Sequence, residues 1–79
     1  MAHPQLRDKE PPGYIMLPAL GLTAINDIFG FISDTPYVRV QLRGHFEPVL
    51  ITEPLRYFEK RLPHFRRISR SRLINPDLL

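Results

Sequence analysis

Alternating side chains over Tyr37-Val-Arg-Val-Gln-Leu42 limit the fold of this chain more than any other feature. Apolar and polar residues follow one another along this segment, which is the period of a β-strand with one buried face. Asp34-Thr-Pro36 precedes it as a turn, and Arg43-Gly-His-Phe-Glu47 follows it as a hairpin-like connection. We expect Pro48-Val-Leu-Ile-Thr52 to return as the next strand, because strands tolerate proline at their first residue.

Two stretches nearer the N-terminus also predict extended chain. Tyr14-Ile-Met-Leu-Pro18 is an apolar run that is too short for a helix and that a proline ends. Leu22–Ala24 and Ile28–Ser33 are rich in β-branched and aromatic residues, with a turn expected at Asn26-Asp27 between them. Four aromatic residues at strand or helix periodicity are expected in the core: Phe29, Phe31, Tyr37 and Phe58.

One short α-helix is expected at about residues 52–62. Thr52 suits the N-cap, because its hydroxyl can accept a hydrogen bond from a free amide of the first turn, and Pro63 ends the helix. Phe65–Ile74 is expected to be a loop that leads into a short strand. Three apolar residues fall on one helical face: Leu55, Phe58 and Leu62. The chain is therefore expected to be mainly β, with short antiparallel strands and a single helix.

Size and composition allow one small domain. The 79 residues include no cysteine, which excludes disulfides and thiolate metal sites, and the three histidines lack metal-ligand spacing. No nucleophile motif or glycine-rich phosphate loop is present, so we expect neither an enzyme nor a cofactor, metal or small-molecule substrate. Residues 1–13 are expected to form a flexible tail before a domain over residues 14–79. Without a signal-peptide pattern or a membrane-spanning run, we expect a cytoplasmic protein.

Charge is concentrated in one stretch. Residues 56–72 contain seven basic side chains and one acidic side chain, a net charge of +6, whereas the whole chain has a formal charge of +3. Such asymmetry favours a polyanionic partner, with nucleic acid ahead of a membrane surface. An arginine cluster of this kind can also be only a soluble surface.

Two patches of the sequence carry a family resemblance. The first joins Ile25-Asn-Asp-Ile-Phe-Gly-Phe-Ile-Ser33 with Tyr37-Val-Arg-Val40. The second is Leu55-Arg-Tyr-Phe-Glu-Lys-Arg-Leu-Pro-His-Phe-Arg-Arg-Ile-Ser-Arg-Ser-Arg-Leu-Ile-Asn75. Both resemble the LytTR family of bacterial DNA-binding domains, the output modules of many response regulators. Pro36 and Ser69 stand where that family commonly has asparagine and histidine.

The resemblance implies an elongated fold of stacked antiparallel sheets in which loops, and no recognition helix, contact DNA. Family members continue through a further hairpin that supplies a base-reading arginine. The resemblance therefore predicts that the domain ending at Leu79 lacks the final hairpin. It implies a bacterial transcription regulator that binds double-stranded DNA as a homodimer or as paired copies. By position, Pro18-Ala19 and Arg43-Gly44-His45 would face successive major grooves.

The residues themselves offer chemistry for such contacts. Arginine meets phosphate or a guanine edge with a planar fork, and serine hydroxyls add neutral donors. The candidates for phosphate contact are Arg66, Arg67, Ser69, Arg70, Ser71 and Arg72. Because phosphate contacts carry no sequence information, base contacts are expected elsewhere, at Arg43 and His45 on the hairpin tip. The resemblance to the LytTR family adds Ala19 as a further base-contact candidate. The alternative function is a protein-interaction or dimerisation fragment that pairs through exposed strand edges.

Overall fold

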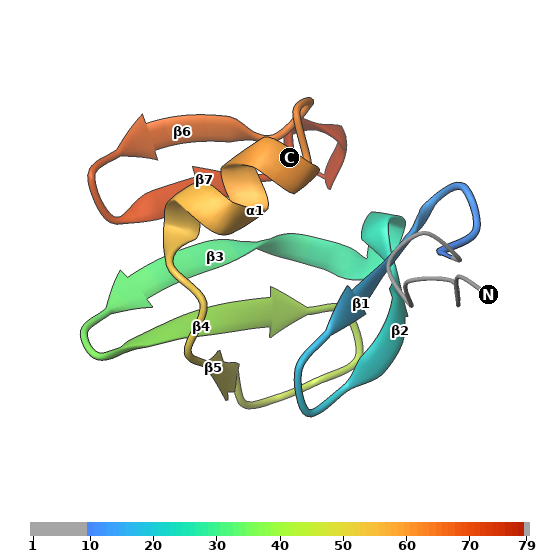
Figure 1. Ribbon diagram of the computed structural model, residues 1–79, viewed down its shortest axis with the longest axis horizontal. Helices are drawn as coiled ribbons and strands as arrows, with labels where there is room; N and C mark the ends of the chain where they lie inside the picture. Colours follow the sequence, from blue (N-terminus) through green and yellow to red (C-terminus); the bar gives the residue numbers. More distant parts are fainter. Residues whose placement is uncertain (1–9, 79) are drawn as a thin grey trace, which may run out of the picture.

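The computed structural model describes residues 10–78, and its strands form two antiparallel sheets (Figure 1). Residues 1–9 of the expected tail lie outside the described residues. A two-stranded hairpin consists of β1 (Tyr14–Leu17) and β2 (Gly21–Ala24). The other sheet has the order β5-β4-β3-β7-β6, with β3 at Ile28–Asp34, β4 at Tyr37–Leu42, β5 at Val49–Ile51, β6 at Arg66–Ser69 and β7 at Arg72–Ile74.

Three short helical segments join or follow these strands. The helix α1 (Leu55–Arg61) connects β5 to β6. Single 3-10 turns lie at Ile25–Asp27, between β2 and β3, and at Pro76–Leu78, after β7. The mainly β architecture expected from the sequence is confirmed, and the alternating segment at Tyr37–Leu42 is a strand over its whole length.

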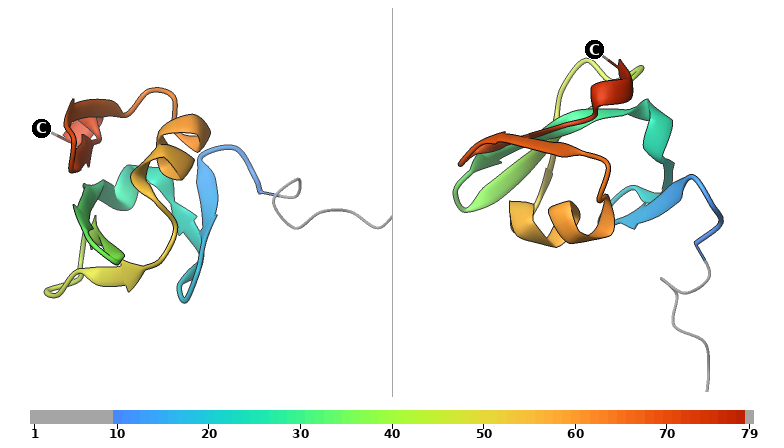
Figure 2. Two further views of the ribbon diagram at one scale, coloured as in Figure 1. Left: turned by 60° about the vertical axis from the view of Figure 1, so that its left-hand side comes forward. Right: turned by 90° about the horizontal axis from the view of Figure 1, so that it is seen from above.

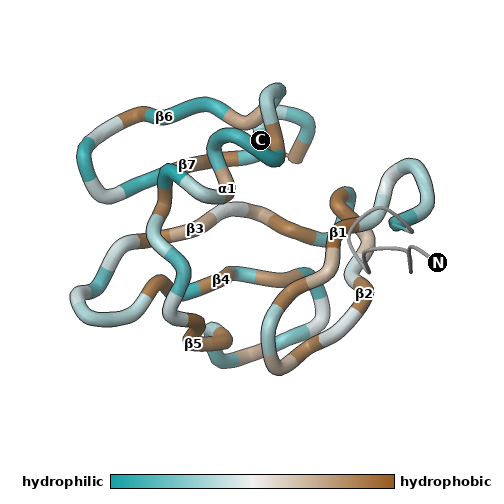
Figure 3. The backbone as a smooth tube through the Cα atoms, in the orientation of Figure 1, coloured by the Kyte–Doolittle hydropathy of each residue, from teal (hydrophilic) through white to brown (hydrophobic). Residues whose placement is uncertain are grey.

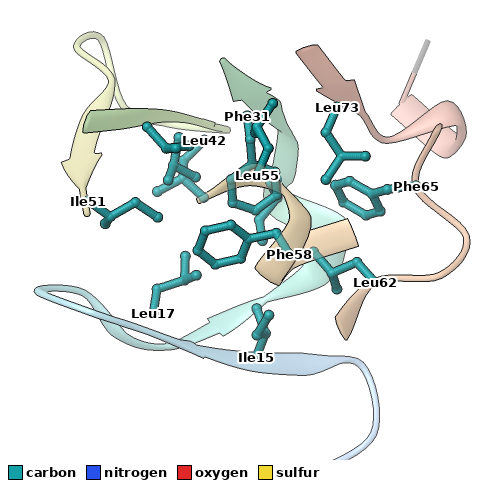
Figure 4. Close-up of a cluster of buried hydrophobic side chains, with 13 residues drawn as sticks. Ile15, Leu17, Phe31, Leu42, Ile51, Leu55, Phe58, Leu62, Phe65 and Leu73 are labelled. Atoms are coloured by element: carbon teal, nitrogen blue, oxygen red, sulfur yellow. The ribbon is translucent and has the colours of Figure 1, made fainter. Parts of the chain in front are cut away.

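The core lies between the inner face of the five-stranded sheet, α1 and β1 (Figures 2 and 4). Ile15 and Leu17 point from β1 toward Phe58, which is fully buried. The ring of Phe58 stacks on that of Phe31, with 4.4 Å between the ring centroids. Because Leu55, Phe58 and Leu62 are all buried, the apolar helix face expected from the sequence is confirmed.

The beginning of the helix differs from the expectation. The helix begins at Leu55, three residues after Thr52, and Pro54 occupies the N-cap with extended backbone and no side-chain hydrogen bond. Thr52 is therefore not the cap. The cause is Pro54 itself, because a proline disfavours the helical conformation of the residue before it, here Glu53.

The segment after the helix also differs from the expectation of a loop that feeds one strand. It is a hairpin in which β6 pairs with β7, and β7 in turn pairs with β3. No glycine, proline or asparagine occupies its turn at Arg70-Ser71, so the usual sequence signal of a hairpin is absent.

Two aromatic residues expected in the core are exposed. Tyr37 shares the outer face of β4 with Arg39 and Gln41, because the buried residues of that strand have the opposite parity. Phe29 lies at an irregularity in the pairing of β3 with β4, between Ile28 and Gly30. Such a bulge leaves one residue unpaired and redirects its side chain, which accounts for the exposure of Phe29.

Asn75 is the one polar side chain that is fully buried among the described residues. Its Nδ2 donates to the carbonyl oxygens of Ile25 and Ile28, at 3.3 and 3.0 Å. Its Oδ1 accepts from the backbone N–H of Asp77 at 3.0 Å. The side chain thus joins the end of β7 to the 3-10 turn before β3, and every contact it makes is internal to the fold.

Replacing Gly30 with alanine is expected to lower the free energy of unfolding by about 2–3 kcal/mol, because a methyl group there overpacks a strand pair. A Cβ atom at Gly30 would lie 2.6 Å from the carbonyl oxygen of Leu73 and 3.3 Å from the Cα of Ile74. Both neighbours are backbone atoms of β7, so neither can rotate away. Urea unfolding of the two proteins measures the loss. A change below about 0.5 kcal/mol, ordinary for a surface site, would contradict this contact.

Candidate nucleic-acid interface

The expected phosphate-contacting residues all lie on the β6–β7 hairpin, called here the basic hairpin (residues 66–74). Its turn lies at the same end of the sheet as the β3–β4 turn, and most of its residues are hydrophilic (Figures 1 and 3). The backbone N–H of Ser33 donates to the carbonyl oxygen of Ser71 at 2.7 Å, which fixes the turn against β3. All the candidate residues on this hairpin are exposed: Arg66, Arg67, Ser69, Arg70, Ser71 and Arg72.

Arg67 differs from the other arginines of the basic hairpin because its guanidinium is already engaged. Its Nη1 donates to a carboxylate oxygen of Glu59 on α1 at 2.8 Å. Its Nε and Nη2 donate to the carbonyl oxygens of Ser69 and Arg70, at 2.9 and 2.7 Å. The side chain of Arg67 therefore stabilises the turn through the carbonyl oxygens of Ser69 and Arg70, although the turn has no typical turn residue. Its bond to Glu59 also links the turn to α1.

The remaining arginines of the basic hairpin have no ion pair within residues 10–78. Arg72 pairs across the ladders with Ile32 and Ser69, so it lies on the outer face of the sheet, opposite to the buried Leu73. Arg66 pairs with Ile74 on that same outer face. Within the basic hairpin, the arginines that make no ion pair in residues 10–78 are Arg66, Arg70 and Arg72.

The basic surface extends beyond the basic hairpin to a residue that the sequence did not single out. Arg56 of α1 and Arg70 line one open groove of about 400 Å³ between the helix and the two hairpin turns. Glu53 also lines it, with a buried Oε1 that makes no hydrogen bond within residues 10–78. The inclusion of Arg56 in the +6 stretch was the only sequence signal for this position.

Arg43 and His45 lie at the opposite end of β4, on the loop to β5 (residues 43–48). The backbone N–H of His45 donates to the carbonyl oxygen of Leu42 at 3.2 Å, and Gly44 has φ of 83°, as in a type II turn. The Nε of Arg43 is 3.5 Å from a carboxylate oxygen of Asp27, and its guanidinium carbon is 5.8 Å from the ring centroid of Phe29. The terminal nitrogens of Arg43 make no hydrogen bond within the described chain.

Ala19 occupies a similar turn between β1 and β2. The backbone N–H of Leu20 donates to the carbonyl oxygen of Leu17 at 3.2 Å, with Pro18 and Ala19 in the central positions. Ala19 has φ of 70°, a conformation that costs an L-residue about 1–2 kcal/mol and that glycine adopts freely. Leu20, the residue after Ala19, lines a groove of about 240 Å³ together with Arg43 and His45. The tips of the two loops themselves lie apart (Figure 2). We call them together the loop surface (residues 18–20 and 43–48).

The β4–β5 loop and the turn of the basic hairpin lie toward opposite ends of β3. Leu42 pairs with Ile28 at one end of β3, and Ser33 contacts Ser71 near the other end. At about 3.3 Å per residue, the length of β3 places the turn of the basic hairpin roughly 20 Å from the Leu42 end of β4. Arg66 lies nearer to that end, because it pairs with Ile74, which in turn pairs with Gly30. The structure thus places Arg43 and His45 on one loop, with the turn of the basic hairpin toward the other end of β3.

Other kinds of site find no support among the described residues. Residues 10–78 contain no group of three or more histidine, aspartate or glutamate side chains placed to hold a metal ion. In the same part of the chain, no helix has the length and apolar character needed to cross a membrane. The side chains exposed on the loop surface and the basic hairpin include guanidinium, imidazole and hydroxyl groups.

Comparison with known proteins identifies one family. The family model of the LytTr DNA-binding domain matches residues 19–79. No curated protein and no solved structure gave a significant match. The matched range includes both the loop surface after Pro18 and the whole basic hairpin. Since the match covers more than half of the sequence, the chain belongs to the LytTR family of DNA-binding domains.

Proposed function

We propose that this domain binds a specific site in double-stranded DNA as part of a bacterial transcription regulator of the response-regulator type, in the cytoplasm. The observation that supports the proposal best is that exposed arginines lie on the turn of the basic hairpin and, toward the other end of β3, on the β4–β5 loop. DNA-binding proteins separate backbone contacts, which position the protein, from base contacts, which specify the sequence. The basic hairpin has the chemistry of the first kind of contact and the loop surface that of the second.

The phosphate contacts are assigned to Arg66, Arg70 and Arg72, with the hydroxyls of Ser69 and Ser71 as neutral donors. Their guanidinium groups have no competing carboxylate within the described residues, so they can release counterions when they meet phosphates. Arg67 was expected to join them. We infer that it mainly positions the turn, because three of its donors are already engaged by Glu59, Ser69 and Arg70.

The base contacts are assigned to Arg43, His45 and Ala19. Asp27 and Phe29 orient the guanidinium of Arg43 from one side, which leaves its terminal fork for the N7 and O6 atoms of a guanine. Gly44 lets the backbone approach the bases closely. The methyl group of Ala19 suits an apolar contact with thymine, and its presence at an unfavourable φ fits a side chain that has a function there.

The distance between the β4–β5 loop and the turn of the basic hairpin fits contacts along one face of a DNA duplex. Roughly 20 Å corresponds to about six base pairs at 3.4 Å per base pair along the strand. A single copy can therefore contact bases at one position and phosphates about half a helical turn away. A homodimer, or two copies on repeated half-sites, would then place equivalent contacts one or more turns apart.

The edges of the five-stranded sheet give little support to the alternative function of pairing through exposed edges. The edge strand β5 has only three residues. The other edge strand, β6, begins with two arginines and has an irregular register between Arg67 and Ser69. Short, charged and bulged edges are the features by which native sheets discourage pairing with another chain.

Selection of bound sequences from a random duplex pool tests the proposal. We expect a recovered consensus that contains a repeated half-site, with an affinity that falls as salt concentration rises. A pool that yields no consensus at any salt concentration would contradict sequence-specific binding. Binding that does not depend on salt would contradict the assigned phosphate contacts.

A further inference from the structure

Phe46 is the most exposed large apolar side chain among the described residues, with a relative exposure of 105%. The other exposed residues of this kind are partly covered, with relative exposures between 37% and 53%. Single apolar side chains are common on protein surfaces, so the exposure of Phe46 is informative here because of its position beside Arg43 and His45. Nothing in the fold requires a fully solvated phenyl ring on the β4–β5 loop.

The position of Phe46 connects it with the base-contact candidates. It follows His45 directly and lies three residues after Arg43, just beyond the turn that contains Gly44. Phe46 and His45 line an open cleft of about 250 Å³ together with Phe29, over which the guanidinium of Arg43 lies. Whatever approaches Arg43 and His45 therefore also meets this ring.

The major groove offers such a ring one apolar partner. Base edges in that groove present hydrogen-bond donors and acceptors, and the 5-methyl group of thymine is the only apolar group among them. We propose that Phe46 contacts a thymine methyl group in the major groove, next to the bases that Arg43 and His45 contact. This inference rests on the proposed function and adds a sequence preference that neither polar side chain can supply.

Substitution of thymine by uracil tests the contact, since it removes the methyl group and leaves every hydrogen-bonding atom in place. In a duplex recovered from the random pool, each thymine is replaced by deoxyuridine, one position at a time. The affinity of the wild-type domain is expected to fall about fourfold at one thymine per half-site, the effect of one lost methyl burial. The Phe46→Ala variant should bind the thymine duplex about fourfold more weakly and should not distinguish thymine from uracil at that position.

Tyr57→Ala is the matched control, because Tyr57 is another exposed aromatic residue but lies on α1. It should keep the full response to uracil. A wild-type domain that is indifferent to uracil at every thymine would overturn the inference, as would a Phe46→Ala variant that keeps the full response. Either result leaves DNA binding intact, whereas a pool without any recovered duplex removes the proposed function and this inference together.

Discussion

Replacing Arg66, Arg70 and Arg72 together with alanine is expected to lower the affinity for duplex DNA about 500-fold at 0.1 M salt. Each phosphate contact contributes about 0.9 to the slope of log affinity against log salt concentration, so three lost contacts remove about 2.7. The loss arises because these guanidinium groups are exposed and have no ion pair within residues 10–78. Fluorescence anisotropy at several salt concentrations gives both the affinity and the slope.

Two single variants provide the matched comparison, since each removes one exposed positive charge. Arg72→Ala lies on the basic hairpin, and Lys60→Ala lies on α1. The first should reduce the slope by about 0.9, and the second should leave it unchanged. Equal effects of the two variants would mean that only net charge matters and that the basic hairpin has no special role.

Asn75→Asp is expected to lower the free energy of unfolding by about 3–5 kcal/mol. The change replaces the Nδ2 donor with an acceptor that faces the carbonyl oxygens of Ile25 and Ile28, in a fully buried position. A domain of this length has about 4–12 kcal/mol of total stability, so the variant should lose a large fraction of it near neutral pH. Circular dichroism with urea titration measures the loss.

The effect should depend on pH in a known direction. Water solvates the introduced carboxylate in the unfolded chain but not in the folded one, so stability falls as rising pH ionises the group. Asn26→Asp is the control, because it makes the same chemical change at an exposed residue of the neighbouring 3-10 turn. It should change stability by less than about 0.5 kcal/mol. Similar losses in the two variants would contradict the structural role of Asn75.

Much of the fold could be predicted because local patterns and burial agree. The alternation over Tyr37–Leu42 predicted a half-buried strand, and Val38, Val40 and Leu42 are buried in it. The spacing of Leu55, Phe58 and Leu62 likewise predicted the buried face of α1. In both elements the spacing of the apolar residues matches the repeat of that element, two residues in a strand and about 3.6 in an α-helix. The buried side therefore follows directly from the sequence.

The features that could not be predicted depend on contacts between distant residues. The basic hairpin has no typical turn residue, and its turn carbonyls are satisfied instead by the side chain of Arg67, held by Glu59. Phe29 is exposed because of an irregular register with β4, which no local pattern indicates. The fully internal hydrogen bonding of Asn75 likewise appears only when β7 meets the turn before β3.

The candidate site shows the same division. Composition located the charge in residues 56–72 but could not separate the engaged guanidinium of Arg67 from those of Arg66, Arg70 and Arg72. That separation depends on Glu59, which the fold brings next to the hairpin. The distance of roughly 20 Å between the Leu42 end of β4 and the turn of the basic hairpin follows only from the length of β3 and its pairing.

The most direct test of the account compares Arg43→Ala with Arg72→Ala on the selected duplex and on a scrambled duplex of equal length, over a range of salt concentrations. Arg43→Ala is expected to lower the ratio of specific to scrambled affinity by about tenfold or more and to change the salt slope little. Arg72→Ala is expected to reduce the slope by about 0.9 and to leave the ratio nearly unchanged. If both variants changed the ratio and the slope alike, the loop surface and the basic hairpin would not have the separate functions that the account assigns to them.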